Sequence, residues 1–592
     1  MTDISPRRLG FGIAAIWALA SVILLIVARQ NIATLTMWDP DDYMRLQQVR
    51  DWLGGQSVFD VTQYRLAPPA GYAMHWSRIV DAPIAALCLI LRPLLGPVLA
   101  ERAAISVVPL LILGGIMAAT ALATARIADR PTALTAAMLV VAAPLILFQI
   151  LPLRIDHHGW QTMMGLTAFA ALFDRDPRRS GWLSGMAAAV WLAVSLEGLP
   201  MVAAIGALLA VRFALAGARD GDDARLRGFV AGLGLGSLLL FAALHGPPAW
   251  AERACDAIGP AWFGPFLLTP LLLFALAPRV ARRGPAARIA ALLAAGGAGL
   301  GLLAATAPAC LGGPFATLDP LVRAIWYENV LEGMPIWRQP ANNAVVLIAF
   351  PLVGLAGAIV ARATAATPLA RRDWTTALLL LLTAFAVSLL VQRAGALAHG
   401  LALPGAAALL RRLLDAIGRW RRMPARVLAS ATALILVTPI GGTGLVGLGL
   451  TAFQGQDDAP KPAAATPCSP RCDRFAAVDR LLPAYMLANL DLAPAALVNT
   501  RHRFAGSGYH RNVAAIHRVI DAFLSPPDVS RRMMVRTGMR YVLVDPDAGE
   551  SDTYRKAAPH GLMARLLAGR PPPWLQPVPL AGSPLLLWKR VS

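Results

Sequence analysis

The sequence is poor in charged residues and almost lacks lysine. Charged residues make up 15% of the 592 residues, hydrophobic residues make up 57%, and the mean hydropathy is +0.57. A soluble domain of this size would not reach that hydropathy, so the chain is predicted to be a polytopic membrane protein. The lysines are Lys461, Lys556 and Lys589, which leaves arginine as the basic residue of the apolar part. We find no internal repeat and no long low-complexity tract.

The arginines give a net charge of +20, which in a soluble protein would suggest a nucleic-acid partner. Here they gather in short loops between apolar runs, a pattern typical of membrane topology. We therefore expect the lipid bilayer, and no nucleic acid, as a partner.

Cysteine is also scarce, with five residues in the chain. Cys88, Cys255 and Cys310 lie in or beside apolar segments, whereas Cys468 and Cys472 flank Ser-Pro-Arg in a polar tail. A local disulfide fits the tail pair if the tail is extracytoplasmic. Two cysteines alone make a poor zinc site.

Apolar segments of roughly 17–25 residues predict about thirteen membrane-spanning helices. Their ranges are 10–28, 103–125, 132–152, 159–173, 181–197, 200–217, 228–245, 262–277, 289–309, 343–361, 375–391, 398–415 and 427–451. Arg7 and Arg8 precede the first range and no small-residue cleavage site follows it, so this span is predicted to be uncleaved. With the N-terminus in the cytoplasm, every arginine-rich loop between spans lies on the cytoplasmic side.

The stretch 79–97 is apolar, but Arg92-Pro93 and Gly96-Pro97 interrupt it. We interpret it as an interfacial or re-entrant helix, because counting it as a span would place the arginine-rich loops outside. On this interpretation the polar segments share the outer face. They are the first loop (29–102), the loop at Asp156, the insert 310–342, the loop at Arg393 and the C-terminal tail.

Two domains are predicted: a transmembrane domain over 1–452 and a small soluble α/β domain over 453–592. In the second, strands are predicted at 496–498, 541–544 and 585–588, and helices at 511–524 and 559–568.

A carboxylate and two imidazoles, Asp156, His157 and His158, lie between two long apolar runs. Ionisable residues in such places are usually functional. Asp156 and His158 are two positions apart, so their side chains can converge as metal ligands in an extended or turn conformation. The alternative is that one of the histidines caps the next helix or bonds a neighbouring carbonyl.

Other polar clusters lie in the remaining outer segments. Asp39, Asp41 and Asp42 follow the first span, where the alternative to a functional site is a helix cap with an acidic first turn. Glu332 lies in an aromatic loop of the kind that also anchors proteins at a membrane interface.

Arg393 follows the eleventh span and needs an anionic partner at an outer surface. A lipid phosphate or diphosphate is one candidate, and the alternative is an ion pair with Glu197 or with a lipid headgroup. In the tail, Tyr509 and His510 follow Gly506-Ser507-Gly508, where substrate contact and a plain turn explain the residues equally well.

These motifs and their order resemble the GT-C membrane glycosyltransferases, particularly the catalytic subunit of oligosaccharyltransferase and its single-subunit bacterial and archaeal relatives. That family has an Asp-x-Tyr pattern with Arg nine positions after the Asp, which Asp41 to Tyr43 and Arg50 match. Asp156 to His158 is similar to the His form of the second motif. Asn329 to Glu332 is similar to the Thr-Ile-x-Glu motif with Asn in place of Thr, and Arg393-Ala394-Gly395 with Pro404 matches the last motif.

The resemblance implies a divalent metal, Mg²⁺ or Mn²⁺, bound by Asp41, Asp156, His158 and Glu332, with Asp41 also catalytic and Arg393 binding the donor phosphate. Asp39, Asp42, His157, Tyr509 and His510 are candidate substrate contacts. The family's Trp-Trp-Asp-Tyr-Gly acceptor motif is missing from this chain, so transfer to an Asn sequon is not implied.

The resemblance predicts a metal-assisted glycosyltransferase of a bacterial inner membrane. Its partners would be a polyprenyl-linked sugar donor and a protein, lipid or glycan acceptor on the periplasmic side. The N-terminus would be cytoplasmic and the C-terminal domain periplasmic. The alternative from the residues alone is a transporter or lipid flippase with an intramembrane ion site.

Overall fold

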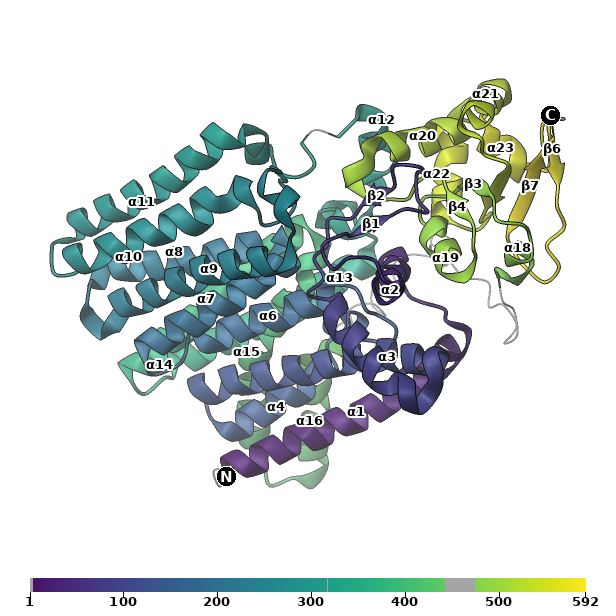
Figure 1. The fold of residues 1–592 in the computed structure, drawn as a ribbon. Helices are drawn as coiled ribbons and strands as arrows, with labels where there is room; N and C mark the ends of the chain where they lie inside the picture. The colour runs from purple at the N-terminus through teal and green to yellow at the C-terminus, as the bar shows by residue number, and fades with distance from the viewer. Residues whose placement is uncertain (1–3, 317, 442–443, 445–473, 592) are drawn as a thin grey trace.

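The computed structural model describes residues 4–316, 318–441, 444 and 474–591. A helical bundle holds the N-terminus, and a smaller α/β domain holds the C-terminus (Figure 1). The helix α2 (Pro40–Leu53) and a hairpin of β1 (Thr62–Gln63) and β2 (Tyr72–Ala73) lie between the two parts. The boundary predicted near residue 452, together with Cys468 and Cys472, falls outside the described residues.

The helices of the bundle overlap the ranges predicted for spans, and one of them begins at Asp81, within the stretch interpreted as interfacial or re-entrant. They are α1 (Pro6–Thr34), α3 (Asp81–Ile127), α4 (Arg130–Val140), α5 (Pro144–Phe148), α6 (His158–Ala171), α7 (Pro177–Val194), α8 (Leu199–Ala216), α9 (Asp222–Leu244), α10 (Thr269–Val280), α11 (Pro285–Thr306), α13 (Ala341–Ala363), α14 (Pro368–Leu390), α15 (Gly395–Ile417) and α16 (Met423–Val437). Within the described residues, seven helical segments are long and apolar enough to cross a membrane: those containing α1, α3, α8, α9, α11, α13 and α14. The predicted fold class, a polytopic helical membrane domain with a small α/β domain, is confirmed.

Glycine and proline break two of the apolar segments. The helix α3 changes direction at Gly96, where φ is +73°, so residues 81–95 are separate from the helix that follows, as the interruption at 79–97 predicted. The segment 132–152 was predicted as one helix, but α4 ends at Val140 and α5 begins at Pro144. The physical reason is that proline disfavours helical geometry in the residue before it, and Ala143 is extended with ψ of 103°.

Glycines allow the bundle helices to pack closely. A Cβ on Gly405 of α15 would lie 2.1 Å from the carbonyl oxygen of Gly354 on α13. A Cβ on Gly185 of α7 would likewise lie 2.2 Å from the carbonyl oxygen of Phe229 on α9. Helices in lipid associate through such small residues, because close backbone approach supplies the packing energy.

The C-terminal domain has a five-stranded sheet with the order β4-β3-β5-β7-β6. The strands are β3 (Tyr485–Ala488), β4 (Arg503–Phe504), β5 (Tyr541–Val544), β6 (Leu575–Pro577) and β7 (Leu586–Arg590). The first three are parallel and the last two antiparallel to their neighbours. The helices are α18 (Ala476–Asp479), α19 (Leu492–Asn499), α20 (Val513–Leu524), α21 (Pro527–Thr537), α22 (Gly549–Ala557) and α23 (Leu562–Leu567).

The elements predicted for this domain are mostly confirmed. β5, β7, α20 and α23 coincide with or overlap their predicted ranges. The elements that were not predicted are β3, β4, β6, α18, α21 and α22. The predicted strand at 496–498 is wrong, because these residues belong to α19. A short apolar run suits a buried helix as well as a strand, and here it packs against α2.

The C-terminal domain shares its core with both long loops of the bundle. Leu318 and Val322, beside and within α12 (Pro320–Ile325), pack among residues of α20 and the sheet. Tyr72 and Trp76 from the first loop pack with β3 and α19. These contacts bring three parts of the chain that are distant in sequence to one end of the bundle.

Candidate functional site

The loop that carries Asp156 is fastened to the start of α2 by Asp42. The side chain of Asp42 is buried, and its Oδ1 accepts hydrogen bonds from the backbone N–H groups of Ile155 at 2.8 Å and Asp156 at 3.0 Å. Its Oδ2 accepts one from Arg154 at 3.1 Å. Asp42 is therefore placed to position Asp156, whereas the resemblance made it a candidate substrate contact.

Asp156 lies beside both histidines. Its Oδ1 is 2.5 Å from Nδ1 of His157, and its Oδ2 is 3.4 Å from Nε2 of His158, the first residue of α6. The same His158 nitrogen is 3.8 Å from Oε2 of Glu332 in the short turn η8 (Leu331–Gly333). The structure thus brings together three of the four predicted ligands, from two segments distant in sequence.

The fourth predicted ligand, Asp41, lies within electrostatic range of these groups. Burial and the neighbouring charges of Asp156, Asp39 and Glu332 raise the pKa of Asp41 well above its usual range. Asp39 is the N-cap of α2 and accepts a hydrogen bond from the backbone N–H of Asp41 at 3.0 Å. The helix-cap alternative therefore describes Asp39, while Asp41 remains available for chemistry.

The charges within the histidine pair are unequal. Against the effect of burial, the charge of Asp156 raises the pKa of His157 to about 10. The two histidines in turn hold the pKa of Asp156 well below its usual range, although burial acts in the opposite direction. His157 thus offers a positive charge to Asp156 and to Glu197, whose Oε2 is 3.7 Å from its Nε2.

Arg393 lies in the turn η10 (Gln392–Ala394) and pairs with two carboxylates. It forms an ion pair with Glu197, and its Nη2 is 3.1 Å from Oε1 of Glu332. The ion pair that was the alternative to phosphate binding is thus present. In the part of the chain that the structure describes, the Nε of Arg393 is nevertheless buried without a hydrogen-bond partner, which leaves a donor for a ligand.

Of the two tail residues predicted as candidate contacts, only Tyr509 reaches this site. Its hydroxyl lies 3.4 Å from the carbonyl oxygen of Pro40, and burial and the charge of Asp41 raise its pKa well above the usual range. His510 points elsewhere and pairs with Asp256 at 2.7 Å.

The residues fit a divalent cation. The Oδ2 of Asp156 is buried without a hydrogen-bond partner among the described residues, and a buried polar atom in this state requires an explanation. Three carboxylates and one imidazole are hard oxygen donors with one borderline nitrogen, a set suited to Mg²⁺ or Mn²⁺. Within the described residues, Asp156, His157 and His158 offer ligand atoms that all lie within 4.8 Å of one another.

Asp491 was not predicted as a site residue, and it follows β3 at the edge of the sheet where the parallel strands end. Its side chain is exposed, yet enclosure by the surrounding protein, with the charges of Asp39 and Glu332, raises its pKa to about 6. No local motif marks it, because only the tertiary fold brings it to the other carboxylates.

Comparison with known proteins supports the fold but not a sequence family. No protein-family model matches the chain, and no curated protein sequence matches it. The archaeal oligosaccharyltransferase AglB from Archaeoglobus fulgidus, in complex with an inhibitory peptide and a dolichol-phosphate, matches with a TM-score of 0.67 at 14% identity, over 93% of this chain and 71% of that chain. A structure of the Archaeoglobus fulgidus oligosaccharyltransferase with Zn and sulfate matches with a TM-score of 0.58 at 14% identity, over 93% of this chain and 70% of that chain. The chain therefore has the fold of these oligosaccharyltransferases, as the resemblance predicted.

Proposed function

We propose that the chain is a glycosyltransferase that moves a sugar or glycan from a polyprenyl phosphate or diphosphate to an acceptor. The observation that carries this proposal is the convergence of Asp156, His158 and Glu332, with Asp41 and Arg393 beside them, in a GT-C fold. The dolichol-phosphate named for the archaeal structure supports a polyprenyl carrier.

The same proposal places the enzyme in a bacterial inner membrane with this site on the periplasmic side. The distribution of arginine supports that orientation, because the arginine-rich loops lie opposite the site segments. The acceptor would be a protein, lipid or glycan, and the missing acceptor motif argues against an Asn sequon.

In the proposed reaction, the acceptor attacks the anomeric carbon of the sugar, the bond from that carbon to the phosphate oxygen breaks, and the polyprenyl phosphate or diphosphate leaves. A divalent cation held by Asp41, Asp156, His158 and Glu332 would supply Lewis-acid stabilisation of the leaving group. Arg393 adds its charge and its unpaired Nε to the same phosphate. Asp41 receives the acceptor's proton, a role that suits a carboxyl group with a raised pKa.

The test is transfer of label from radiolabelled polyprenyl-linked sugars in membranes containing the enzyme. Asp41→Asn and Asp156→Asn are each expected to lower the rate by about 100-fold or more. Asp51→Asn is the matched control, since Asp51 lies on the same helix and bonds Gln47 and Gln63 instead of site residues. Folded Asp41 and Asp156 variants with the wild-type rate would contradict the assignment.

The orientation is tested separately by labelling single cysteines introduced at positions 161 and 328 with a membrane-impermeant reagent. Labelling of both in intact spheroplasts supports a periplasmic site. Labelling that requires lysis would place the site in the cytoplasm and overturn the proposed orientation.

A further inference from the structure

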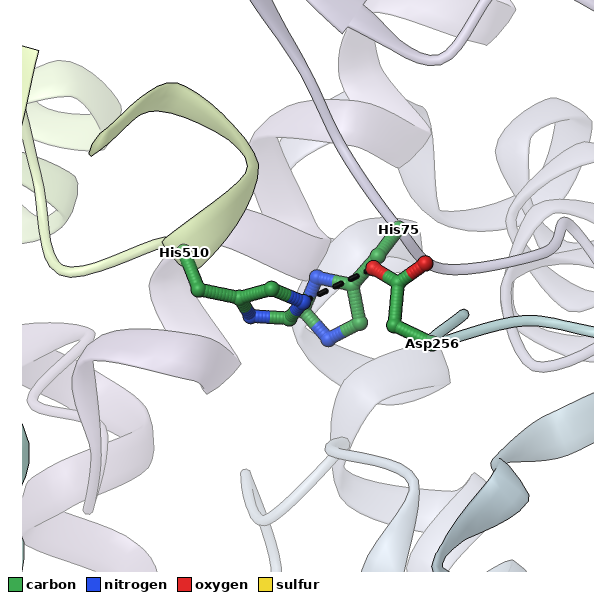
Figure 2. A group of neighbouring side chains, drawn as sticks. All are labelled: His75, Asp256 and His510. Atoms are coloured by element: carbon green, nitrogen blue, oxygen red, sulfur yellow. Dashed lines mark hydrogen bonds and ion pairs between the residues drawn. The ribbon is translucent and has the colours of Figure 1, made fainter. Parts of the chain in front are cut away.

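A second cluster of potential metal ligands lies apart from the carboxylates described above. It consists of His75 from the first loop, Asp256 from the segment after α9, and His510 from the turn η11 (His510–Asn512) of the C-terminal domain. Figure 2 shows the side chains converging from three parts of the chain. Each offers a ligand atom within 4.8 Å of the others, and Nε2 of His510 is 2.7 Å from Oδ2 of Asp256.

A buried imidazole nitrogen of His75 and a small cavity are both available at this cluster. The Nδ1 of His75 is buried, and no described residue forms a hydrogen bond with it. A cavity of about 20 Å³, lined in part by His75, His245 and Asp256, lies beside it. A cavity of roughly 10–15 Å³ holds one water molecule, so this one has room for a water as a further ligand.

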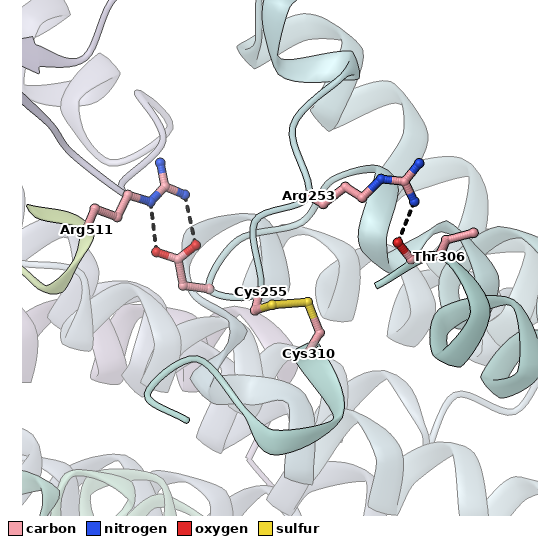
Figure 3. The surroundings of a disulfide bond; sticks show 6 residues. Arg253, Cys255, Thr306, Cys310 and Arg511 are labelled. Carbon is pink, nitrogen blue, oxygen red and sulfur yellow. Dashed lines mark hydrogen bonds and ion pairs between the residues drawn. A yellow bond between two sulfur atoms is a disulfide. The ribbon is translucent and has the colours of Figure 1, made fainter. Parts of the chain in front are cut away.

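Arg511 holds the carboxylate of Asp256 in place by donating two hydrogen bonds to it. Nε of Arg511 is 2.8 Å from Oδ2 of Asp256, and Nη2 is 2.9 Å from Oδ1. The adjacent Cys255 forms a disulfide with Cys310, which ties this segment to the end of α11 (Figure 3). Ligating carboxylates are commonly hydrogen-bonded by outer residues, which fix their orientation. Arg511 would have this role.

We propose that His75, Asp256 and His510 form a zinc site that fastens the C-terminal domain to the membrane domain. Two imidazoles and one carboxylate are a donor set that Zn²⁺ takes in tetrahedral sites, with water completing the coordination. Zinc bonds of about 2.0–2.1 Å place tetrahedral ligand atoms roughly 3.3 Å apart. The His510 and Asp256 atoms would therefore separate slightly when the ion binds, and the hydrogen bond between them would be replaced by two bonds to the metal.

The position of the cluster gives such an ion a structural effect on the site described above. His510 is adjacent to Tyr509, which lies against the start of α2 at Pro40. His75 is adjacent to Trp76, whose ring centroid is 6.3 Å from that of His157. An ion that joins His75 to His510 would hold both neighbours, and with them the two sides of the candidate active site.

Metal content tests the proposal without reference to catalysis. The full chain carrying Asp156→Ala and His158→Ala, which removes two ligands of the other proposed metal site, is stripped with a chelator, equilibrated with Zn²⁺ and analysed by elemental mass spectrometry. This variant is expected to retain about one zinc ion per chain, and adding His75→Gln or His510→Gln should abolish that binding. His517→Gln is the matched control, because His517 also pairs with a carboxylate, Asp319 at 2.9 Å, but belongs to no three-ligand group among the described residues.

Two further readouts keep the test decisive. Zn²⁺ should raise the Tm of the Asp156→Ala, His158→Ala protein and should have no effect once His75 is replaced. If the His75 and His510 variants do not fold, Co²⁺ is added to the Asp156→Ala, His158→Ala protein, where the visible bands of a tetrahedral ion are expected. Absence of zinc from that protein, or binding that survives replacement of His75 and His510, would overturn the proposal and leave the cluster as an ion pair between domains. The proposed glycosyltransferase activity would be untouched by that result.

Discussion

Replacing Asp42 by alanine is expected to release the loop that carries Asp156. The carboxylate of Asp42 accepts the backbone N–H groups of Ile155 and Asp156 as well as a hydrogen bond from Arg154. Each buried donor left unsatisfied costs about 1–3 kcal/mol. For the two backbone groups the loss is about 2–6 kcal/mol, and a water molecule entering the vacated space would bring it toward the lower figure. Arg154 keeps a partner in Asp39, 3.3 Å away.

The loss of activity should exceed what unfolding alone explains. A displacement of about 1 Å at a catalytic group can reduce a rate on the order of 100-fold, and the loop sets the position of Asp156. Asp42→Asn is the informative companion, because its amide oxygen can still accept both backbone N–H groups. It should restore most of the stability and much of the activity lost in Asp42→Ala.

The pH dependence distinguishes the two variants further. Burial raises the pKa of Asp42 to about 7, against the effect of Arg154. A carboxyl group whose pKa is raised by folding stabilises the fold fully at low pH, and that contribution is lost as the pH rises through the raised value. The neutral amide of Asp42→Asn shows no such loss. The stability of Asp42→Asn relative to wild type should therefore increase as the pH rises from about 4 to about 7, and should level off above that.

The assays are thermal unfolding in detergent across this pH range and label transfer from polyprenyl-linked sugars. Asp51→Asn, on the same helix, controls for the general effect of removing a carboxylate from α2. If Asp42→Ala kept both the wild-type Tm and the wild-type transfer rate, the positioning role assigned to Asp42 would be refuted.

Three further outcomes are expected. Asp39→Asn keeps a helix-capping side chain but removes a charge that raises the pKa of Asp41. The acid limb of the pH-activity profile should therefore move to lower pH with little change in Tm, and an unmoved limb would count against Asp41 as the base. Gly508→Ala would place a Cβ 2.8 Å from Nε1 of Trp326, so the contact between the C-terminal domain and the insert 310–342 should shift. Sugar transfer should slow while the protein stays folded, and a wild-type transfer rate would argue that this contact does not position the site. Arg393→Lys removes the planar guanidinium that pairs with two carboxylates, so the rate of sugar transfer should fall by about 100-fold. A much smaller loss of rate would show that a positive charge alone suffices at this position.

Much of the bundle could be predicted because its signals are local. Long apolar runs and arginine-rich loops predicted the spans, and proline and glycine accounted for the break at Gly96. The same local signals failed at 496–498, where a short apolar run became a helix against α2, and at Pro144, which divides a predicted span. In both places the deciding factor was packing or backbone geometry that a count of apolar residues does not contain.

The candidate site was less accessible from sequence, because its residues meet through the tertiary fold. Asp156 and His158 are neighbours in the chain, and their proximity followed from spacing. Glu332 joins them only through the folded insert, and Asp491 only through the C-terminal domain. The positioning role of Asp42 could not be predicted either, since its partners are backbone groups more than 100 positions away.

Arginine holds the carboxylates of the site together in the described structure. Arg154 pairs with Asp39 and Asp42, and Arg393 pairs with Glu332 and Glu197. These pairs offset much of the repulsion among the carboxylates, but the Oδ2 of Asp156 has no hydrogen-bond partner. Leaving a buried acceptor unsatisfied costs about 1–3 kcal/mol, so a fold that retains one is readily explained if a ligand binds there in the working protein. A cation is the ligand that this oxygen and its neighbours suit best.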